Sequence, residues 1–496
     1  MKKKIIVIGS GFAGLSAACF MAKAGCDVTV LEKQPTPGGR ARQLKADGFT
    51  FDMGPSWYWM PDVFEHFFNA FGKKVSDYYT LHRLDPSYRI YEQERTLDIP
   101  AGYQALKDLF EQLEPGSGAR LDKFLDEAAY KYQVGINKLV HKPGRSLNEF
   151  LDWDLLTGIF RLDVFNSVKS HVAKYFTHPS IRQLMEFPVL FLGALPEKTP
   201  ALYSLMNYAD IKGGTWYPEG GMYSIVNAMY QLALELGVRF HFNHSVKEII
   251  IESSAAKKVI AEYDGKPLVY TADAVIGGAD YHHIESALLP GEYRSYSETY
   301  WNNRVMAPGC LIYYIGLNKR LNGILHHSLF FDASFEKHGR EIYVTKEWPS
   351  DPLFYVSATS VTDHNVAPHG CENLFFLIPV AAGLENDDEA LRDHYFNKVV
   401  TRMEQRTGQS IRPHIIYKRT FAHSNFIEEY NAFKGNAYGL ANTLMQTAIL
   451  KPACRSRKVK NLFYTGQLTV PGPGVPPSLI SGEVVAKQVL KSFKDR

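Results

Sequence analysis

The residues between Gly9 and Glu32 have the types and the spacing that dinucleotide binding needs. Gly9 permits a tight turn, Gly11 lets the backbone approach a pyrophosphate, and Gly14 lets a helix pack closely on a strand. The Glu32 carboxylate can accept hydrogen bonds from ribose hydroxyls and would repel a 2′-phosphate, which disfavours NADP. The nucleotide-binding residues predicted at this end are Gly9, Gly11, Phe12, Ala13, Gly14, Glu32 and Lys33.

A strand, a helix and a second strand must position these residues. Residues 5–8 form an apolar run, an alanine-rich helical stretch extends to Ala24, and a second apolar run covers residues 28–31. In this order the N-terminus of the helix faces the phosphates and the acidic residue ends the second strand. The pattern therefore predicts a βαβ nucleotide-binding unit rather than an isolated glycine turn.

Two segments downstream indicate which dinucleotide is bound. The sequence PGGRA at residues 37–41 and the sequence FDMGP at residues 51–55 resemble the second dinucleotide motif of the flavin amine oxidase and carotenoid desaturase superfamily. The resemblance implies that Arg40 lies near the pyrophosphate and that the Gly54 segment passes beside the isoalloxazine ring. It therefore implies FAD as the cofactor. The residues that it adds to the predicted site are Gly39, Arg40, Met53, Gly54 and Pro55.

The middle and the C-terminal part of the chain resemble the same superfamily. Residues 461–466 read as a buried strand ending in glycine, and residues 472–477 lead into a helix. Residues 216–222 resemble a W-x-P-x-G-G motif, and Val246 matches a valine whose backbone touches adenine in that superfamily. Residues 274–280 resemble the strand that returns to the flavin domain. The site residues implied here are Val246, Gly466, Val475 and Pro476.

The order of these motifs predicts an α/β fold with a Rossmann-like FAD-binding domain built from three discontinuous segments. We assign residues 1–75, 211–295 and 421–496 to this domain. The intervening stretches are too long to be loops. We expect residues 76–210 to form a helical, membrane-associating substrate insert and residues 296–420 to form an α+β substrate-binding insert.

Further motifs extend the resemblance over nearly the whole chain and narrow it to bacterial phytoene desaturases. Residues 181–196 resemble the L-R-Q pattern of that family, with Leu195 in place of an asparagine, and residues 444–452 resemble L-T-Q-S-A-W-F-R-P. The aromatic residues of the second motif are replaced by Ile449 and Leu450, which puts the shape of a polyene tunnel in doubt. The resemblance implies FAD-dependent desaturation of phytoene to lycopene or a related all-trans polyene.

Other functions remain open at this point. A carotenoid desaturase acting on a hydroxylated or C30 substrate would carry the same flavin motifs. A flavin amine oxidase shares both end motifs, although the closing motif here has Ser478 and Ser481 and lacks a cysteine for covalent flavin. A lipid escort or a reduced-flavin isomerase on the same fold are further alternatives. Arg40, Glu32 and Gly466 argue against an escort that has lost its flavin.

Desaturation needs a hydride acceptor and a route for one proton. Flavin N5 can accept the hydride, and a water-excluded pocket with a nearby base would serve the proton. Asp210 and Glu186 are the candidate catalytic carboxylates because each lies on an insert, and a satisfied or surface carboxylate is the alternative for both. No role is assigned to His282 and His283. A second glycine motif for NAD(P)H and metal-ligand spacing are both absent, so oxygen or a membrane quinone is the expected electron acceptor and no metal is expected.

Bulk composition restricts the class of protein further. The 55 basic and 52 acidic residues nearly balance at a net charge of +3, which does not suggest a nucleic-acid-binding surface. Five scattered cysteines suggest reduced thiols. The sequence has neither a signal-peptide pattern nor an apolar run of about 18 residues, so we expect a peripheral protein on the cytoplasmic face of a membrane.

An apolar substrate has to be collected from the bilayer, and one stripe suggests how. Apolar residues recur every four positions, with Phe165 and the cations Arg161, Lys169 and Lys174 nearby. A basic amphipathic helix of this kind can lie in a membrane interface, whereas the alternative places the stripe against the protein core. Aromatic residues between Trp57 and Phe71 could line a tunnel or join the membrane face. The stripe consists of Phe160, Val164, Val168, Val172 and Phe176.

Overall fold

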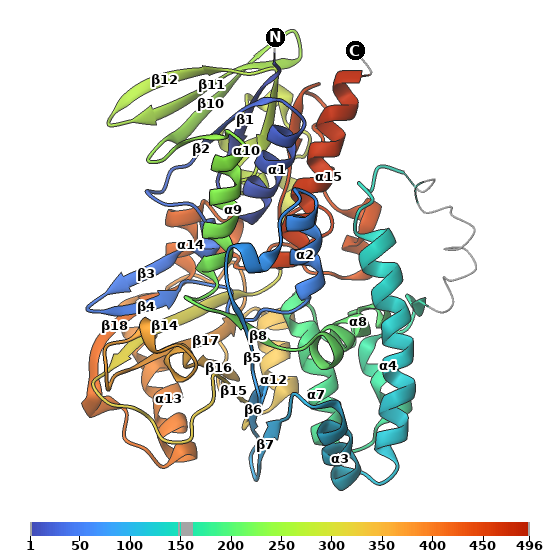
Figure 1. The fold of residues 1–496 in the computed structure, drawn as a ribbon, viewed down its shortest axis with the longest axis vertical. Helices are drawn as coiled ribbons and strands as arrows, with labels where there is room; N and C mark the ends of the chain where they lie inside the picture. Colours follow the sequence, from blue (N-terminus) through green and yellow to red (C-terminus); the bar gives the residue numbers. More distant parts are fainter. Residues whose placement is uncertain (1, 147–148, 150–161, 495–496) are drawn as a thin grey trace.

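A computed structural model describes residues 2–146, 149 and 162–494, and its architecture is shown in Figure 1. One half contains a five-stranded sheet in the order β19-β13-β1-β2-β9. Its neighbouring strands pair in parallel, as an α/β nucleotide-binding fold requires. Its strands are β1 (Lys4–Ile8), β2 (Asp27–Leu31), β9 (Arg239–His241), β13 (Ala274–Gly277) and β19 (Leu462–Tyr464).

The apolar run of β1 is continuous because both faces of this sheet are covered. Ile5 and Val7 pack into a core with three helices, whereas Ile6 and Ile8 pack against a three-stranded antiparallel sheet on the other face. The helices are α1 (Phe12–Lys23), α9 (Tyr223–Glu235) and α15 (Val475–Lys494). The three-stranded sheet consists of β10 (Ser245–Glu252), β11 (Ala255–Tyr263) and β12 (Lys266–Thr271).

The other half is built on a seven-stranded mixed sheet in the order β18-β14-β17-β16-β15-β6-β7. Its strands are β6 (Tyr88–Tyr91), β7 (Thr96–Ile99), β14 (Gly309–Leu317), β15 (His327–Phe330), β16 (Phe354–Ser357), β17 (Glu372–Val380) and β18 (Ile415–Phe421). Strands β6 and β7 come from the first predicted insert and the others come from residues beyond 308. The two inserts therefore share one sheet.

Alternating residues of β14 show what each face of this sheet contacts. Tyr313 and Ile315 pack into the core formed with α13 (Glu389–Thr407), whereas Cys310 and Ile312 point to the opposite side, toward the first half of the molecule. Shorter elements connect the two halves: β3 (Gln43–Ala46), β4 (Phe49–Asp52), α2 (Pro61–Asn69), β5 (Leu81–Arg83), β8 (Trp216–Pro218), α10 (Tyr281–Ala287), α11 (Glu298–Asn302), α12 (Phe335–Arg340) and α14 (His423–Tyr430).

Helices of the first insert pack beside this sheet (Figure 1). They are α3 (Tyr103–Leu113), α4 (Ser117–Val134), the π-helical turn η3 (Gly135–Leu139), α6 (Val168–Tyr175), α7 (Pro179–Glu186) and α8 (Leu205–Tyr208). Among the described helices none is long and apolar enough to cross a bilayer. The parallel sheet confirms the predicted α/β fold with a Rossmann-like domain.

The predicted membrane-facing helix is not one continuous helix. Phe160 lies outside the described residues, and Val164 lies in a turn. Helix α6 begins only at Val168, because Ser167 is its N-cap and the Ser167 Oγ accepts a hydrogen bond from the Ser170 backbone N–H at 3.1 Å.

The part of the stripe within α6 and at its C-terminus lies in the core. Val168, Val172 and Phe176 have no exposed surface. The Phe176 ring packs against the rings of Phe110 and Phe124, with centroid distances of 5.6 Å and 6.0 Å. The prediction that this stripe faces a membrane is therefore wrong, since neighbouring helices cover it.

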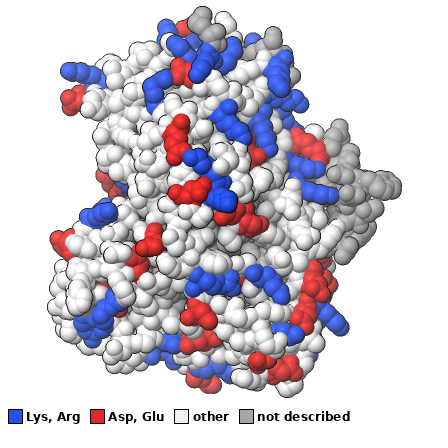
Figure 2. All heavy atoms as spheres, in the orientation of Figure 1, with Lys and Arg blue, Asp and Glu red and all other residues white. Residues whose placement is uncertain are grey.

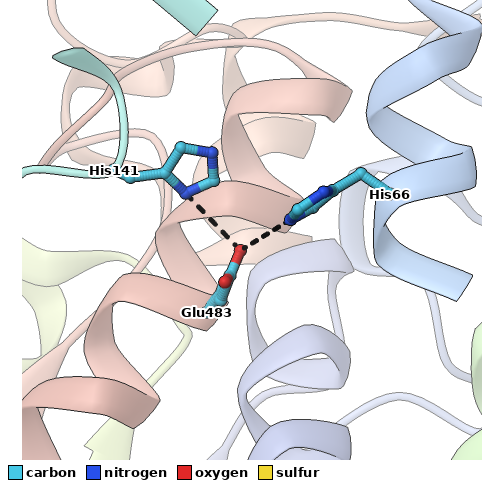
Figure 3. Close-up of side chains that lie close together, drawn as sticks. All are labelled: His66, His141 and Glu483. Atoms are coloured by element: carbon cyan, nitrogen blue, oxygen red, sulfur yellow. Dashed lines mark ion pairs between the residues drawn. The ribbon is translucent and has the colours of Figure 1, made fainter. Parts of the chain in front are cut away.

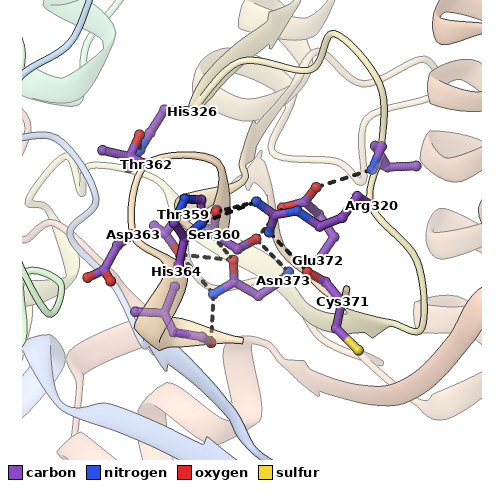
Figure 4. A network of polar contacts seen from close by, with 12 residues as sticks. Arg320, His326, Thr359, Ser360, Thr362, Asp363, His364, Cys371, Glu372 and Asn373 are labelled. Carbon is purple, nitrogen blue, oxygen red and sulfur yellow. Dashed lines mark hydrogen bonds and ion pairs between the residues drawn. The ribbon is translucent and has the colours of Figure 1, made fainter. Parts of the chain in front are cut away.

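A polar network ties the seven-stranded sheet to the elements that connect the two halves (Figure 4). The Asn373 Oδ1 of β17 accepts hydrogen bonds from the backbone N–H of Ser360 at 2.9 Å and from the Thr359 hydroxyl at 3.0 Å. Its Nδ2 donates to the Thr50 carbonyl of β4 at 2.9 Å. Asp363 accepts a hydrogen bond from the Gly220 backbone N–H at 2.8 Å. The loop between β16 and β17 is thereby tied to segments on both sides.

Candidate active site

A cavity of about 460 Å³ lies between the two halves. Its wall on one side is formed by residues that directly follow the parallel strands: Gly9 after β1, Glu32 after β2, Gly278 after β13 and Gly466 close after β19. The carboxyl ends of parallel strands share one edge of the sheet, which is where α/β folds bind ligands. The opposite wall is the inner face of the seven-stranded sheet.

The three motif glycines perform different tasks. Gly9 has φ +93°, and its backbone N–H donates to the Leu31 carbonyl at 2.8 Å. A Cβ on Gly14 would lie 2.1 Å from the Gly9 carbonyl oxygen, so Gly14 allows helix α1 to approach the β1 turn. A Cβ on Gly11 would meet no heavy atom within 4 Å, because this position opens into the cavity. Gly11 thus leaves room for a ligand rather than for the protein.

The Glu32 carboxylate is oriented by the same turn. Its Oε2 accepts hydrogen bonds from the Ser10 backbone N–H at 2.8 Å and from the Ser10 hydroxyl at 2.7 Å, and its Oε1 accepts one from the Gln34 backbone N–H at 2.9 Å. A carboxylate has about four acceptor positions, so one remains for a ribose hydroxyl. Glu32, Lys33 and Val246 line the cavity together.

Arg40 places a buried cation at the cavity. Its Nε is buried and has no hydrogen-bond partner among the described residues, and one terminal nitrogen donates to the Asn436 carbonyl at 3.4 Å. Burial lowers the pKa of Arg40, while the nearby Asp280 and Tyr430 oppose this shift. An incompletely paired guanidinium at a glycine turn is suited to a diphosphate.

The second glycine motif packs directly on the first. Gly39 has φ +54°, and a Cβ there would lie 3.3 Å from the Gly11 Cα. A Cβ on Gly54 would lie 2.5 Å from the Arg40 carbonyl oxygen. The C-terminal helix α15 packs against the site. Its Ser481 hydroxyl accepts a hydrogen bond from the Gly466 backbone N–H at 3.0 Å.

The structure brings most of the predicted cofactor residues to one cavity. The exceptions are Gly14, which packs against the turn, and Met53, whose carbonyl accepts a hydrogen bond from the Tyr314 hydroxyl at 2.8 Å and whose side chain is buried in the core. The predicted residues that line the cavity are Gly9, Gly11, Phe12, Ala13, Glu32, Lys33, Gly39, Arg40, Gly54, Pro55, Val246, Gly466, Val475 and Pro476. This set fits a dinucleotide, since it combines the glycine cradle, a ribose acceptor and the Arg40 cation.

The remainder of the cavity is apolar and aromatic. Trp57 and Trp59, two residues of the aromatic cluster, line it. Tyr58, Phe64 and Phe68 are buried in the core beside α1 instead. The other large apolar lining residues include Phe187, Leu190, Met206, Leu329, Phe331, Phe335, Tyr343, Leu353, Phe354, Tyr355, Leu377 and Tyr438.

Asp210 does not line this cavity. Its carboxylate is buried and accepts hydrogen bonds from the Tyr88 hydroxyl at 2.7 Å and from the Thr215 hydroxyl at 3.2 Å. The Trp59 indole N–H donates to the same Thr215 hydroxyl at 2.8 Å. Burial raises the pKa of Asp210 to about 6, against the effect of these donors and of Arg83. Asp210 therefore lies behind the part of the cavity wall that Trp59 forms.

Glu186 lies outside the cavity as well, although its neighbour Phe187 lines it. Burial raises the pKa of Glu186 to about 7, with Lys169 and Arg182 opposing the shift. The His282 Nε2 lies within hydrogen-bond distance of a Glu298 carboxylate oxygen, at 3.0 Å.

Several lining residues were missed by the sequence-based predictions. Asp280 is buried beside Arg40 and caps helix α10, where its carboxylate accepts the His283 backbone N–H at 3.3 Å. The Tyr430 ring lies 5.5 Å from the Arg40 guanidinium carbon. The acidic residue at the end of a returning strand was a usable signal for Asp280, whereas nothing local marked Tyr430.

Comparison with known proteins agrees with this geometry. The family described as flavin containing amine oxidoreductase matches residues 12–490. A carotenoid 3,4-desaturase of Haloarcula japonica is 41% identical over 99% of this chain and 98% of its own. A zeta-carotene-forming phytoene desaturase of Myxococcus xanthus is 32% identical over 98% of this chain and 94% of its own.

A crystal structure of an oxidoreductase from Methanosarcina mazei has the same fold, with a TM-score of 0.64 at 15% identity, covering 98% of this chain and all of that one. The match to the family spans nearly the whole chain and includes lining residues near both ends, among them Phe12 and Val475. The protein accordingly belongs to the flavin containing amine oxidoreductases and, within them, is an FAD-dependent oxidoreductase of the carotenoid desaturase type.

Proposed function

We propose that the cavity binds FAD and an apolar carotenoid end to end and that the protein desaturates the carotenoid. The observation that carries the proposal is the two-part lining, in which a dinucleotide cradle continues into aromatic and aliphatic walls. The carboxylates among the described lining residues are Glu32, Asp280 and Glu429. Asp280 lies beside Arg40, and Glu429 forms an ion pair with Arg42. The apolar walls thus suit a hydrocarbon and lack a carboxylate partner for an ammonium group.

The substrate is desaturated by loss of a hydride from one carbon and a proton from its neighbour, which leaves a C=C bond. When bound, FAD supplies the hydride acceptor, and we expect oxygen or a membrane quinone to reoxidise it. The protein's own part is to hold the polyene between its aromatic walls and to exclude water from the developing cation. Trp59, held by Thr215, is one such wall residue.

Two desaturation reactions, which differ in their substrate, are candidates for this protein. Similarity to the Haloarcula enzyme favours 3,4-desaturation of a carotenoid. This chain is 41% identical to that enzyme over nearly the full length of both, and 32% identical to the phytoene desaturase. The alternative is conversion of phytoene to lycopene.

Product analysis separates these reactions. Purified holoenzyme is incubated with liposomes carrying either phytoene or lycopene, and products are identified by absorbance and mass. Conversion of lycopene to a product two hydrogens lighter, with phytoene unchanged, supports 3,4-desaturation. Conversion of phytoene alone supports the alternative. Failure to oxidise either substrate, together with oxidation of an amine, would refute carotenoid desaturation.

We also propose that the protein collects its substrate at the cytoplasmic face of a membrane, through a surface other than the α6 stripe. Exposed apolar side chains gather around residues 444–450, where Met445 is 71% exposed. Val305 is exposed as well, and its backbone N–H donates to the Gln446 Oε1 at 2.9 Å. Pro308, three residues further on, lines the cavity. We call Val305, Leu444, Met445 and Leu450 the apolar rim.

Liposome flotation tests the apolar rim. Met445→Glu should reduce flotation and activity on liposomal substrate while FAD content and thermal melting stay unchanged, because the side chain is exposed. Val269→Glu on β12 is the matched control, since Val269 is 59% exposed on the three-stranded sheet. Equal flotation of both variants and the parent protein would refute the proposed membrane surface.

In Figure 2 acidic and basic side chains are interspersed over the visible face.

A further inference from the structure

Three segments far apart in the sequence bring two histidines and a carboxylate together beside α15 (Figure 3). His66 belongs to α2, His141 follows η3, and Glu483 lies in the middle of α15. This arrangement is separate from the cavity, because none of the three residues lines it. The desaturation chemistry leaves the cluster without a role.

The donor atoms lie slightly further apart than the ligands of a bound metal ion do. The Glu483 Oε2 lies 3.5 Å from the His141 Nδ1 and 3.8 Å from the His66 Nε2, and all three donor atoms lie within 4.8 Å of one another. Tetrahedral zinc with bonds of about 2.0–2.1 Å has ligand atoms separated by about 3.4 Å. Small side-chain rotations would therefore bring the three donors into contact with one ion.

The donor atoms are also free to take an ion as a partner, and one of them opens to solvent. The His141 Nδ1 is buried and has no hydrogen-bond partner among the described residues. The Glu483 Oε1 forms an ion pair with the Lys487 Nζ at 2.5 Å, which leaves Oε2 directed at the histidines. The His66 side chain is 62% exposed, so an ion can enter from solvent.

We propose that His66, His141 and Glu483 bind a divalent transition metal of the zinc class, with water at the fourth position. Imidazole and carboxylate donors suit Zn²⁺, whereas Mg²⁺ and Ca²⁺ prefer oxygen ligands alone. The metal would join α2, α15 and the segment after η3. Helix α15 thus carries the metal ligand Glu483 and, at its start, the cavity-lining residues Val475 and Pro476.

The test uses untagged holoenzyme that has been treated with a chelator and dialysed. Calorimetric titration with Zn²⁺ should show one equivalent bound and a raised melting temperature, since a ligand of the folded state stabilises it. Loss of an outer partner of a metal ligand already weakens binding about 10- to 100-fold, so His66→Ala and Glu483→Gln should weaken it by at least about 100-fold. The FAD content of both variants should be that of the parent protein.

Two further variants make the test specific. Lys487→Gln should bind Zn²⁺ about 3-fold or more tightly than the parent, because a cation beside the site is removed. His82→Ala is the control, since His82 forms a two-member pair with Glu219 at 3.5 Å and should not affect binding. Absence of Zn²⁺ binding to the parent protein, or unchanged binding by His66→Ala, would overturn the proposal.

Discussion

Substitution of Gly11 by valine separates binding of the cofactor from stability of the fold. Gly11 has φ −69° and ψ 176°, which any L-residue adopts without strain. A Cβ there meets no heavy atom within 4 Å. The apoprotein should therefore change in stability by no more than about 1 kcal/mol, with slight stabilisation from the less flexible unfolded chain.

The Gly11→Val substitution should instead lower the affinity for FAD. The isopropyl group occupies the space into which Gly11 opens, so the pyrophosphate cannot approach the backbone. A charge-assisted hydrogen bond contributes about 1.5–3 kcal/mol, so loss of one such bond raises the Kd for FAD about 10- to 150-fold. Bound flavin per purified chain and fluorescence titration of the apoprotein measure this effect.

Gly14→Ala is the matched comparison. Its Cβ would lie 2.1 Å from the Gly9 carbonyl oxygen, so α1 or the β1 turn has to shift, and overpacking of this kind costs about 1–3 kcal/mol. The alanine variant should lower the melting temperature of the apoprotein, whereas Gly11→Val should not. Our reasoning fails if Gly11→Val keeps FAD at the parent's affinity, or if its apoprotein melts as early as that of Gly14→Ala.

Three further predictions concern the site and the first insert. Glu32→Ala should weaken FAD binding about 10- to 150-fold without abolishing it, as measured by flavin titration, because one charge-assisted hydrogen bond to the ribose is lost. Asp210→Asn should retain FAD yet slow turnover by misplacing the cavity wall; parent rates at full FAD saturation would exclude this role. Because burial raises the folded-state pKa of Asp210 to about 6, the parent protein should lose stability relative to Asp210→Asn as the pH rises from about 4 to 6, which denaturant unfolding at several pH values can measure. Val168→Glu should destabilise the protein by about 3–5 kcal/mol, since it places an unpaired charge in the core. Phe165→Glu should leave the melting temperature unchanged, because Phe165 is 78% exposed. Equal melting temperatures of the two variants would contradict the packing of α6.

The nucleotide end could be predicted from the sequence because its requirements are local. A tight turn, a close backbone approach and an acidic residue after a strand each demand a particular residue type at a particular spacing. Gly9, Gly11, Glu32 and Arg40 therefore appear in the cavity wall as expected. The roles of the glycines and of Glu32 depend on the backbone next to them in the sequence. They could therefore be predicted without knowledge of distant segments.

The tertiary structure decided what covers each apolar or charged side chain. Periodicity marked an apolar stripe at Val168, Val172 and Phe176 but could not show whether lipid or protein faces it, and neighbouring helices turned out to bury it. Asp210 was recognised as a candidate, yet only its contact with Tyr88 shows that it lies behind the cavity wall. Residues that meet across long stretches of chain leave no spacing for a motif, because their proximity results from packing of the whole fold.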